Sequence, residues 1–133
     1  LARVSDIQAD GLNDRIELEL HGSTQRLSAL ITHGSTERLN LQLGAEVFAL
    51  IKASWVHLLP SDGASAHVET NQLTGYVHSL EPGDLESELH LQLPGGAHLT
   101  AMLSNSQLSS RPLVSGEQVS VQINPEQIIL CSV

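Results

Sequence analysis

The sequence predicts an all-β protein made of two tandem OB-fold-like barrels, each with one short helix. Three observations lead to this prediction: the chain is duplicated, its apolar and polar residues alternate, and each copy has one helix-like stretch. Residues 1–58 align with residues 74–130, apart from one residue lost between the turns His21-Gly22 and Pro94-Gly95. The copies share one apolar framework, so the positions at which they differ are candidates for function.

Alternation with a period of two predicts the strands of both copies. Residues 15–20 place Ile16, Leu18 and Leu20 on one face and charged residues on the other, as in a half-buried antiparallel strand. Residues 88–93 repeat this pattern in the second copy. Turns after these segments predict hairpins, and further strands are expected at residues 26–32, 98–104, 46–52, 118–123, 55–59 and 127–130.

The helices and the boundary between the copies follow from local composition. A helix is expected at residues 35–43, and a weaker one at residues 105–111, which Pro112 must end. The segment from Pro60 to Ala66 is rich in Pro, Ser, Gly and Ala, as linkers are. The predicted organisation is therefore a first module at residues 1–59, a linker at 60–68 and a second module at 69–133.

The composition argues against several classes of function. A formal charge of -9 and an aromatic content of 2% disfavour direct binding of nucleic acid. A single cysteine, Cys131, forms no internal disulfide, so we expect a cytoplasmic location. No apolar run reaches the ~18 residues of a membrane span, and the start at Leu1 is interpreted as that of a fragment. Modules of about 60 residues bury little surface alone, which favours a homo-oligomer.

Differences between the copies indicate a possible anion site. Lys52 is the only lysine, and its counterpart in the second copy is Asn124. Thr32 and Ser35 lie where a strand ends and the first helix begins, and Glu37 must point away if an anion binds there. A fully ionised oxyanion only accepts hydrogen bonds, which hydroxyl, ammonium and free amide groups supply. The residues alone leave a second interpretation open, in which Ser35 caps the helix and Lys52 lies at a solvated strand edge.

A cation site and an enzyme fit the sequence less well. His90 and His98 are expected to face each other across a hairpin, but no cysteine or carboxylate pattern completes a metal site around them. Catalysis requires paired groups in one pocket, whereas the acidic residues are expected along polar strand faces and loops, so no enzyme is predicted. Trp55 is expected to anchor the core or an interface. The acidic residues concerned are Glu17, Glu19, Glu81, Asp84, Glu86 and Glu88.

Both copies resemble the Mop module of molybdate-binding proteins. In the first copy the resemblance lies in residues 31–41, in Gly44-Ala45-Glu46-Val47 and in residues 51–56. The second copy, with residues 71–75, residues 93–96 and Asn124 in place of the lysine, is similar to the degenerate second Mop module of the ModE family of molybdate-dependent transcriptional regulators. The resemblance covers essentially the whole chain, and the order and spacing of short motifs carry it.

The resemblance implies a ligand-sensing region that forms a homodimer and binds molybdate or tungstate where two chains meet, with no other cofactor. Thr32, Ser35, Lys52 and Ala53 match ligand-contacting positions of the family. Backbone amides, above all that of Ala53, would add donors.

The family also has a Ser-Ala-Arg-Asn motif before the first strand of a module. That motif would lie before Leu1 here, and its counterpart at residues 69–71 keeps only Asn71. Arg3 aligns inside the strand and is not expected in the site.

The altered second copy favours a regulator whose DNA contacts come from a separate N-terminal domain, with no membrane partner. A sensor needs one ligand-linked interface, whereas a storage protein is expected to keep both lysines. A cytoplasmic molybdate storage protein and the regulatory domain of a molybdate importer ATPase are the alternatives.

Overall fold

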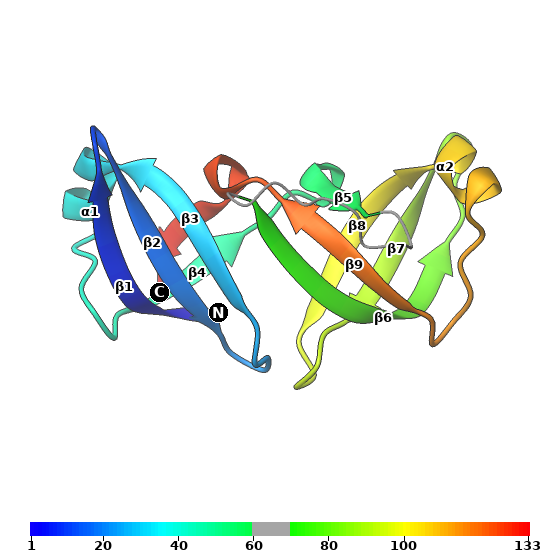
Figure 1. Cartoon of the computed structure of the whole chain (residues 1–133), viewed down its shortest axis with the longest axis horizontal. Coiled ribbons are helices and arrows are strands. Elements are labelled where there is room, and N and C mark those ends of the chain that lie inside the picture. The colour runs from blue at the N-terminus through cyan, green and yellow to red at the C-terminus, as the bar shows by residue number, and fades with distance from the viewer. Residues whose placement is uncertain (60–69) are drawn as a thin grey trace.

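The computed structural model describes residues 1–59 and 70–133, which form two five-stranded antiparallel sheets side by side along the long axis of the molecule (Figure 1). Among these residues no helix is long and apolar enough to cross a membrane. The elements of the first copy are β1 (Ala2–Asp10), β2 (Asn13–Leu20), β3 (Arg26–Thr32), α1 (His33–Arg38), β4 (Glu46–Leu50), η1 (Ala53–Trp55) and β5 (Val56–Leu58). Those of the second are β6 (Asn71–Glu81), β7 (Glu86–Gln92), β8 (His98–Ser104), α2 (Asn105–Ser110), β9 (Gln118–Ile123), η2 (Pro125–Gln127) and β10 (Ile129–Ser132).

The predicted all-β fold with one short helix in each copy is confirmed, and β3, β8 and β9 have the expected bounds. The last strand of each copy begins later than expected. A 3-10 turn, η1 or η2, precedes β5 and β10 and replaces the first residues of the predicted strands. The predicted linker at residues 60–68 lies outside the described residues.

Helix α1 is shorter than the prediction of residues 35–43. It begins at His33 and ends at Arg38, with Leu39 as its C-cap. Asn40 follows with a positive φ of 51°. Asparagine tolerates this left-handed conformation, which ends a helix by turning the chain away from the helical path. The expectation that the helix continues to Leu43 is therefore wrong.

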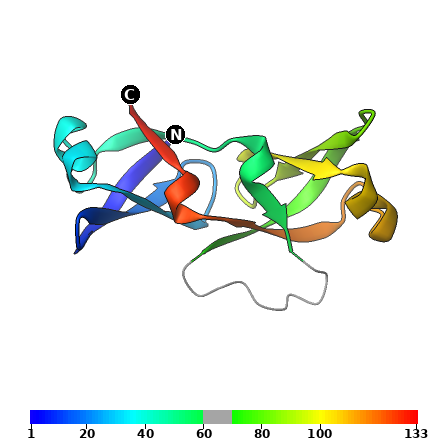
Figure 2. The same ribbon diagram turned by 90° about the horizontal axis from the view of Figure 1, so that it is seen from above.

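The two copies exchange their last strands. The sheet orders are β10-β4-β1-β2-β3 and β5-β9-β6-β7-β8, so β10 of the second copy pairs with β4, and β5 of the first copy pairs with β9. Figure 2 shows the chain crossing between the sheets before η1 and again before η2. Each sheet therefore contains one strand from the other copy, although the repeat divides the sequence at the linker.

The core depends on this exchange. Ile16 and Leu18, and their counterparts Leu89 and Leu91, are fully buried. Val56, the first residue of β5, is buried as well, in the sheet formed mainly by the second copy. Removing either copy would thus remove a strand from the sheet of the other and expose apolar surface, which costs roughly 25 cal/mol per Å².

Candidate anion-binding site

Thr32 and Ser35 lie together at the start of α1, as the sequence predicted. Thr32 is the N-cap, and its Oγ1 accepts a hydrogen bond from the Ser35 backbone N–H at 3.2 Å. The two hydroxyl oxygens are 2.8 Å apart. Both residues line a cavity of about 630 Å³ between β3, α1 and the segment 126–130. Two hydroxyl groups, hydrogen-bonded to each other, therefore line one solvent-accessible space.

Arg38 brings a positive charge to the same cavity, and sequence reasoning missed it. Its Nη2 donates to Ser35 Oγ at 3.0 Å, and the residue lines the cavity beside Thr32. Residues three positions apart lie on the same face of a helix. The spacing of Ser35 and Arg38 could therefore have indicated that a guanidinium joins the hydroxyls.

Glu37 points away from this donor set, as the anion hypothesis requires. Its Oε1 lies 3.1 Å from His33 Nε2, and the other ring nitrogen of His33 lies 2.9 Å from Asp14 Oδ2. A hydrogen bond from Thr36, then the contact with His33, lowers the pKa of Asp14. The hydrogen bond and charge of Asp14, followed by the charge of Glu37, raise the pKa of His33. His33 therefore contacts both carboxylates, and neither Asp14 nor Glu37 lines the cavity.

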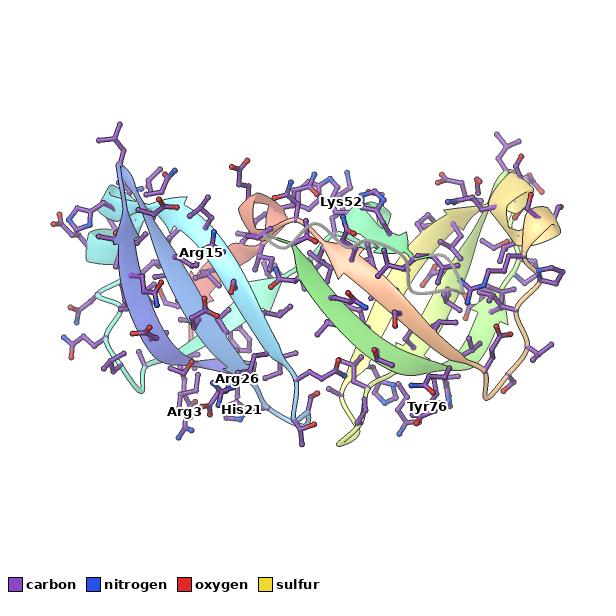
Figure 3. All side chains as sticks on the ribbon, in the orientation of Figure 1. Arg3, Arg15, His21, Arg26, Lys52 and Tyr76 are labelled. Atoms are coloured by element: carbon purple, nitrogen blue, oxygen red, sulfur yellow. The ribbon has the colours of Figure 1, made fainter. Side chains whose placement is uncertain are left out.

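Lys52 and Ala53 lie elsewhere in the chain. Lys52 is the exposed N-cap of η1, and its Nζ lies 5.7 Å from the centre of the half-buried Trp55 ring. Figure 3 shows Lys52 near the middle of the molecule, whereas α1 lies at one end (Figure 1). Turn η1 packs against β8, a strand of the second copy. Neither Lys52 nor Ala53 lines the cavity that contains Thr32.

The corresponding turn of the second copy occupies the place next to Thr32. Turn η2 packs against β3, and Glu126 lines the cavity. Asn124, the counterpart of Lys52, accepts a hydrogen bond from the Glu126 N–H at 2.9 Å. The strand exchange thus separates the predicted site residues of one chain, with Thr32 and Ser35 in one place and Lys52 and Ala53 in another.

The helix start of the second copy satisfies its own hydrogen bonds. Gln107, the counterpart of Ser35, accepts from the Ser104 N–H at 3.1 Å, and the Ser104 hydroxyl accepts from the Gln107 N–H at 3.2 Å. This reciprocal arrangement is a capping box. Gln107 therefore caps its own helix, whereas the Ser35 side chain contacts Thr32 and Arg38.

Two other expectations from the sequence have clear outcomes. His90 and His98 do not face each other: His90 is opposite Thr100, and His98 is opposite Gln92. That prediction was wrong because the register of β7 and β8 offsets the two histidines by two residues. Arg3 lies outside the cavity and pairs with Glu19 at 2.6 Å.

Comparison with known proteins places this geometry in a family. The TOBE domain family matches residues 1–58 and 69–130. The chain belongs to the TOBE domain family. Its two TOBE repeats have the fold of a solved structure of the cytoplasmic molybdate-binding protein ModG with molybdate bound, with a TM-score of 0.92 and 30% identity over 99% of this chain and 93% of that one.

Curated relatives match nearly the whole of this chain within longer sequences. The transcriptional regulator ModE of Yersinia pestis is 40% identical over 121 residues, 91% of this chain and 46% of that protein. The molybdenum-pterin-binding protein MopA of Rhodobacter capsulatus is 30% identical over 127 residues, 96% of this chain and 48% of that protein. The chain spans about half the length of the curated relatives it matches.

Proposed function

We propose that this chain is the molybdate-sensing region of a ModE-type transcriptional regulator. The observation that carries the proposal is the Thr32, Ser35 and Arg38 donor set, which faces a cavity in a fold shared with molybdate-bound ModG. A doubly charged oxyanion accepts hydrogen bonds from hydroxyl and guanidinium groups, and these charge-assisted bonds are stronger than neutral ones. Molybdate or tungstate is the ligand, and no further cofactor takes part.

The complete site requires a second copy of the chain. One chain keeps Thr32 and Ser35 apart from Lys52 and Ala53. In a two-fold symmetric dimer, the Lys52 ammonium and the Ala53 N–H of one subunit approach the hydroxyls of the other. Molybdate thus binds where two chains meet and links ligand binding to the arrangement of the dimer.

An exposed apolar stripe on β4 and β10 supports the homodimer. Leu50 is opposite Ile129 across this strand pair, and Phe48 is opposite Cys131. The exposed fractions of these side chains are 51% for Leu50, 50% for Ile129 and 43% for Phe48. A contiguous patch of exposed apolar side chains is typical of a surface that binds another protein. Ile129 also lines the cavity beside Thr32, so the stripe and the site are continuous.

The second copy favours a sensor over a storage protein. It has Asn124 instead of a lysine, and its capping box closes the counterpart of the Ser35 site. DNA binding belongs to a separate domain of the parent protein, and the chain itself has no catalytic role. The alternative with its own support is a cytoplasmic molybdate-binding protein, because the chain covers 93% of ModG.

A thermal-shift assay tests the ligand class. Molybdate and tungstate should raise the melting temperature of the chain, because a ligand that binds only the folded state stabilises it by mass action. Sulfate, a smaller tetrahedral anion, is the control at equal concentration and ionic strength. Equal shifts with all three anions would indicate general screening of charge and would refute a molybdate site.

A further inference from the structure

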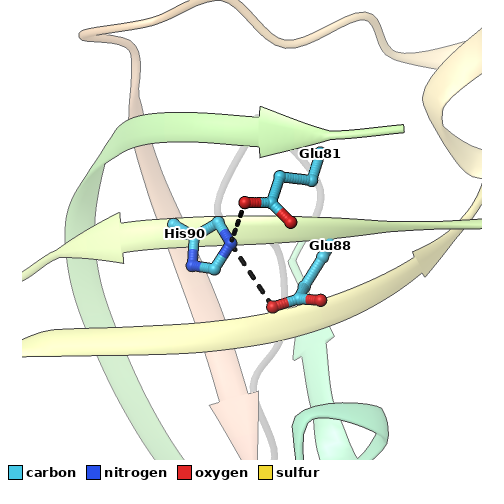
Figure 4. A group of neighbouring side chains, drawn as sticks. All are labelled: Glu81, Glu88 and His90. Carbon is cyan, nitrogen blue, oxygen red and sulfur yellow. Dashed lines mark ion pairs between the residues drawn. The ribbon is translucent and has the colours of Figure 1, made fainter. Parts of the chain in front are cut away.

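A second cluster of polar side chains lies on the outer face of the second sheet, away from the anion cavity. It consists of Glu81 on β6 and of Glu88 and His90 on β7 (Figure 4). Glu81 and Glu88 are directly opposite each other in the strand register. The candidate ligand atoms of all three side chains lie within 4.8 Å of one another.

The imidazole of His90 is directed between the two carboxylates. Its Nε2 lies 3.4 Å from Glu88 Oε1 and 3.7 Å from Glu81 Oε1. These separations exceed the ~2.7–3.2 Å of an ordinary N–H···O hydrogen bond. The Nε2 atom is nevertheless shielded from solvent and has no hydrogen-bond partner among the described residues. Burying a polar atom without a partner is costly, so this atom points to a missing group.

The spacing of the cluster fits a metal ion. With metal–ligand bonds of ~2.1 Å, two ligand atoms of a tetrahedral site are about 3.4 Å apart. The two Nε2–Oε1 separations are close to this value. On the other side of the ring, His90 Nδ1 lies 3.5 Å from Thr100 Oγ1. With Nε2 on a metal, Nδ1 carries the proton and faces that hydroxyl, which is the position that outer partners of metal-bound histidines take.

Charge balance supports the same conclusion. Like charges directly opposite on neighbouring strands destabilise a sheet. Among the described residues, no lysine or arginine forms an ion pair with Glu81 or Glu88. In the first copy the counterparts of these glutamates are Gln8 and Arg15, which are also opposite each other but do not repel. The same pair of opposite strand positions therefore carries two carboxylates in the second copy, whereas it carries one amide and one guanidinium in the first.

We propose that Glu81, Glu88 and His90 bind a divalent transition-metal cation of the Zn²⁺ class, with water completing the coordination. One imidazole and two carboxylates provide nitrogen and oxygen ligands that Zn²⁺ accepts, and a three-residue set leaves a position open to solvent. The site is separate from the anion cavity, and this proposal does not depend on molybdate binding.

Calorimetric titration of the metal-free chain with Zn²⁺ near neutral pH tests the proposal. The wild-type chain should show a site that His90→Gln and Glu88→Gln weaken at least about tenfold, since removing even an outer partner of a metal ligand costs ~10–100-fold in affinity. His57→Gln, at an exposed histidine of β5, is the matched control and should leave that site intact.

Thermal melting distinguishes loss of ligand from loss of fold. Without metal, Glu88→Gln should melt at a temperature equal to or above that of the wild type, because it removes like-charge repulsion. With Zn²⁺, only the wild type and His57→Gln should gain stability. The proposal is overturned if His90→Gln binds Zn²⁺ as tightly as the wild type. It is also overturned if the wild type shows no Zn²⁺ site.

Discussion

The side-chain amide of Asn71 is hydrogen-bonded to both backbone groups of Ser28. Asn71 Oδ1 accepts from the Ser28 N–H at 2.7 Å, and Asn71 Nδ2 donates to the Ser28 carbonyl at 2.8 Å. The amide thereby imitates a neighbouring strand at the edge of β3. Gln25 does the same to Thr74 in the opposite direction, with distances of 2.7 and 2.8 Å. These pairs connect the two sheets, and they satisfy backbone groups of Ser28 on β3 and of Thr74 on β6.

Asn71→Ala should therefore destabilise the whole chain. Asn71 is buried, and its removal leaves the N–H and carbonyl of Ser28 without partners, at a cost of about 1–3 kcal/mol. Urea unfolding followed by circular dichroism measures the change. Gln72→Ala, at the exposed neighbouring position, is the control and should have little effect. Equal stability of Asn71→Ala and wild type would show that this amide does not hold the sheets together.

Lys52→Ala should weaken molybdate binding by at least ~1.5–3 kcal/mol, the value of one charge-assisted hydrogen bond. Isothermal titration calorimetry measures the affinity. Arg3→Ala, at a cation that lies outside the cavity and pairs with Glu19, is the control and should leave the affinity nearly unchanged. Unaltered binding by Lys52→Ala would remove this residue from the site.

Arg38→Gln should reduce the affinity for molybdate about tenfold or more, because it removes a guanidinium donor from the side of Ser35 that faces the cavity. Arg26→Gln, at an arginine that pairs with Glu19 outside the cavity, is the matched control. Calorimetry at two salt concentrations separates a direct contact from a long-range charge effect. If the two variants lose affinity for molybdate equally, Arg38 acts only through the long-range electrostatic potential of the protein and does not contact the anion.

The contact between His33 and Asp14 should make stability depend on pH. The folded-state pKa of His33 is raised above 6.5, so its contribution is fully present below pH 6.5 and is lost as the pH rises through the raised pKa. The pKa of Asp14 is lowered below 3.8, so its contribution is present above pH 3.8 and is lost at lower pH. The pair should therefore stabilise the chain most between these values.

Melting temperatures of wild type and His33→Gln across this range test the effect. The difference in melting temperature should be largest between pH 3.8 and pH 6.5 and should shrink as the pH rises further. Gln42→Ala, at an exposed residue that does not ionise, should show no such trend. A difference between wild type and His33→Gln that stays constant with pH would mean that the pair is not ionic in the folded state.

The sequence predicted most of the strands because alternation is a local signal. Ile16, Leu18 and Leu20 face one side whatever sheet the strand joins. The exchange of β5 and β10 has no such signal, since Val56 is apolar and would be buried equally well in either sheet. The consequence for function is large, because the exchange decides which turn lies beside Thr32.

In the candidate site, too, the sequence predicts contacts between residues that are close in the chain, but not contacts between residues that are far apart in it. The pairing of Thr32 with Ser35 follows from their positions at a helix start, and it was predicted. The separation of Lys52 from them depends on the path of the chain between sheets. The cluster around His90 also depends on register, because β6 brings Glu81 opposite Glu88 from a neighbouring strand.

Stoichiometry of molybdate binding in a defined heterodimer is the most direct test of a site shared between two chains. One subunit carries Ser35→Ala and the other carries Lys52→Ala, with different affinity tags so that the mixed dimer is purified. If Ser35 of one subunit and Lys52 of the other form each site, both changes fall in one site and the second remains intact, so the heterodimer binds molybdate while either homodimer variant does not. A heterodimer that binds no more molybdate than the variant homodimers would contradict the shared site.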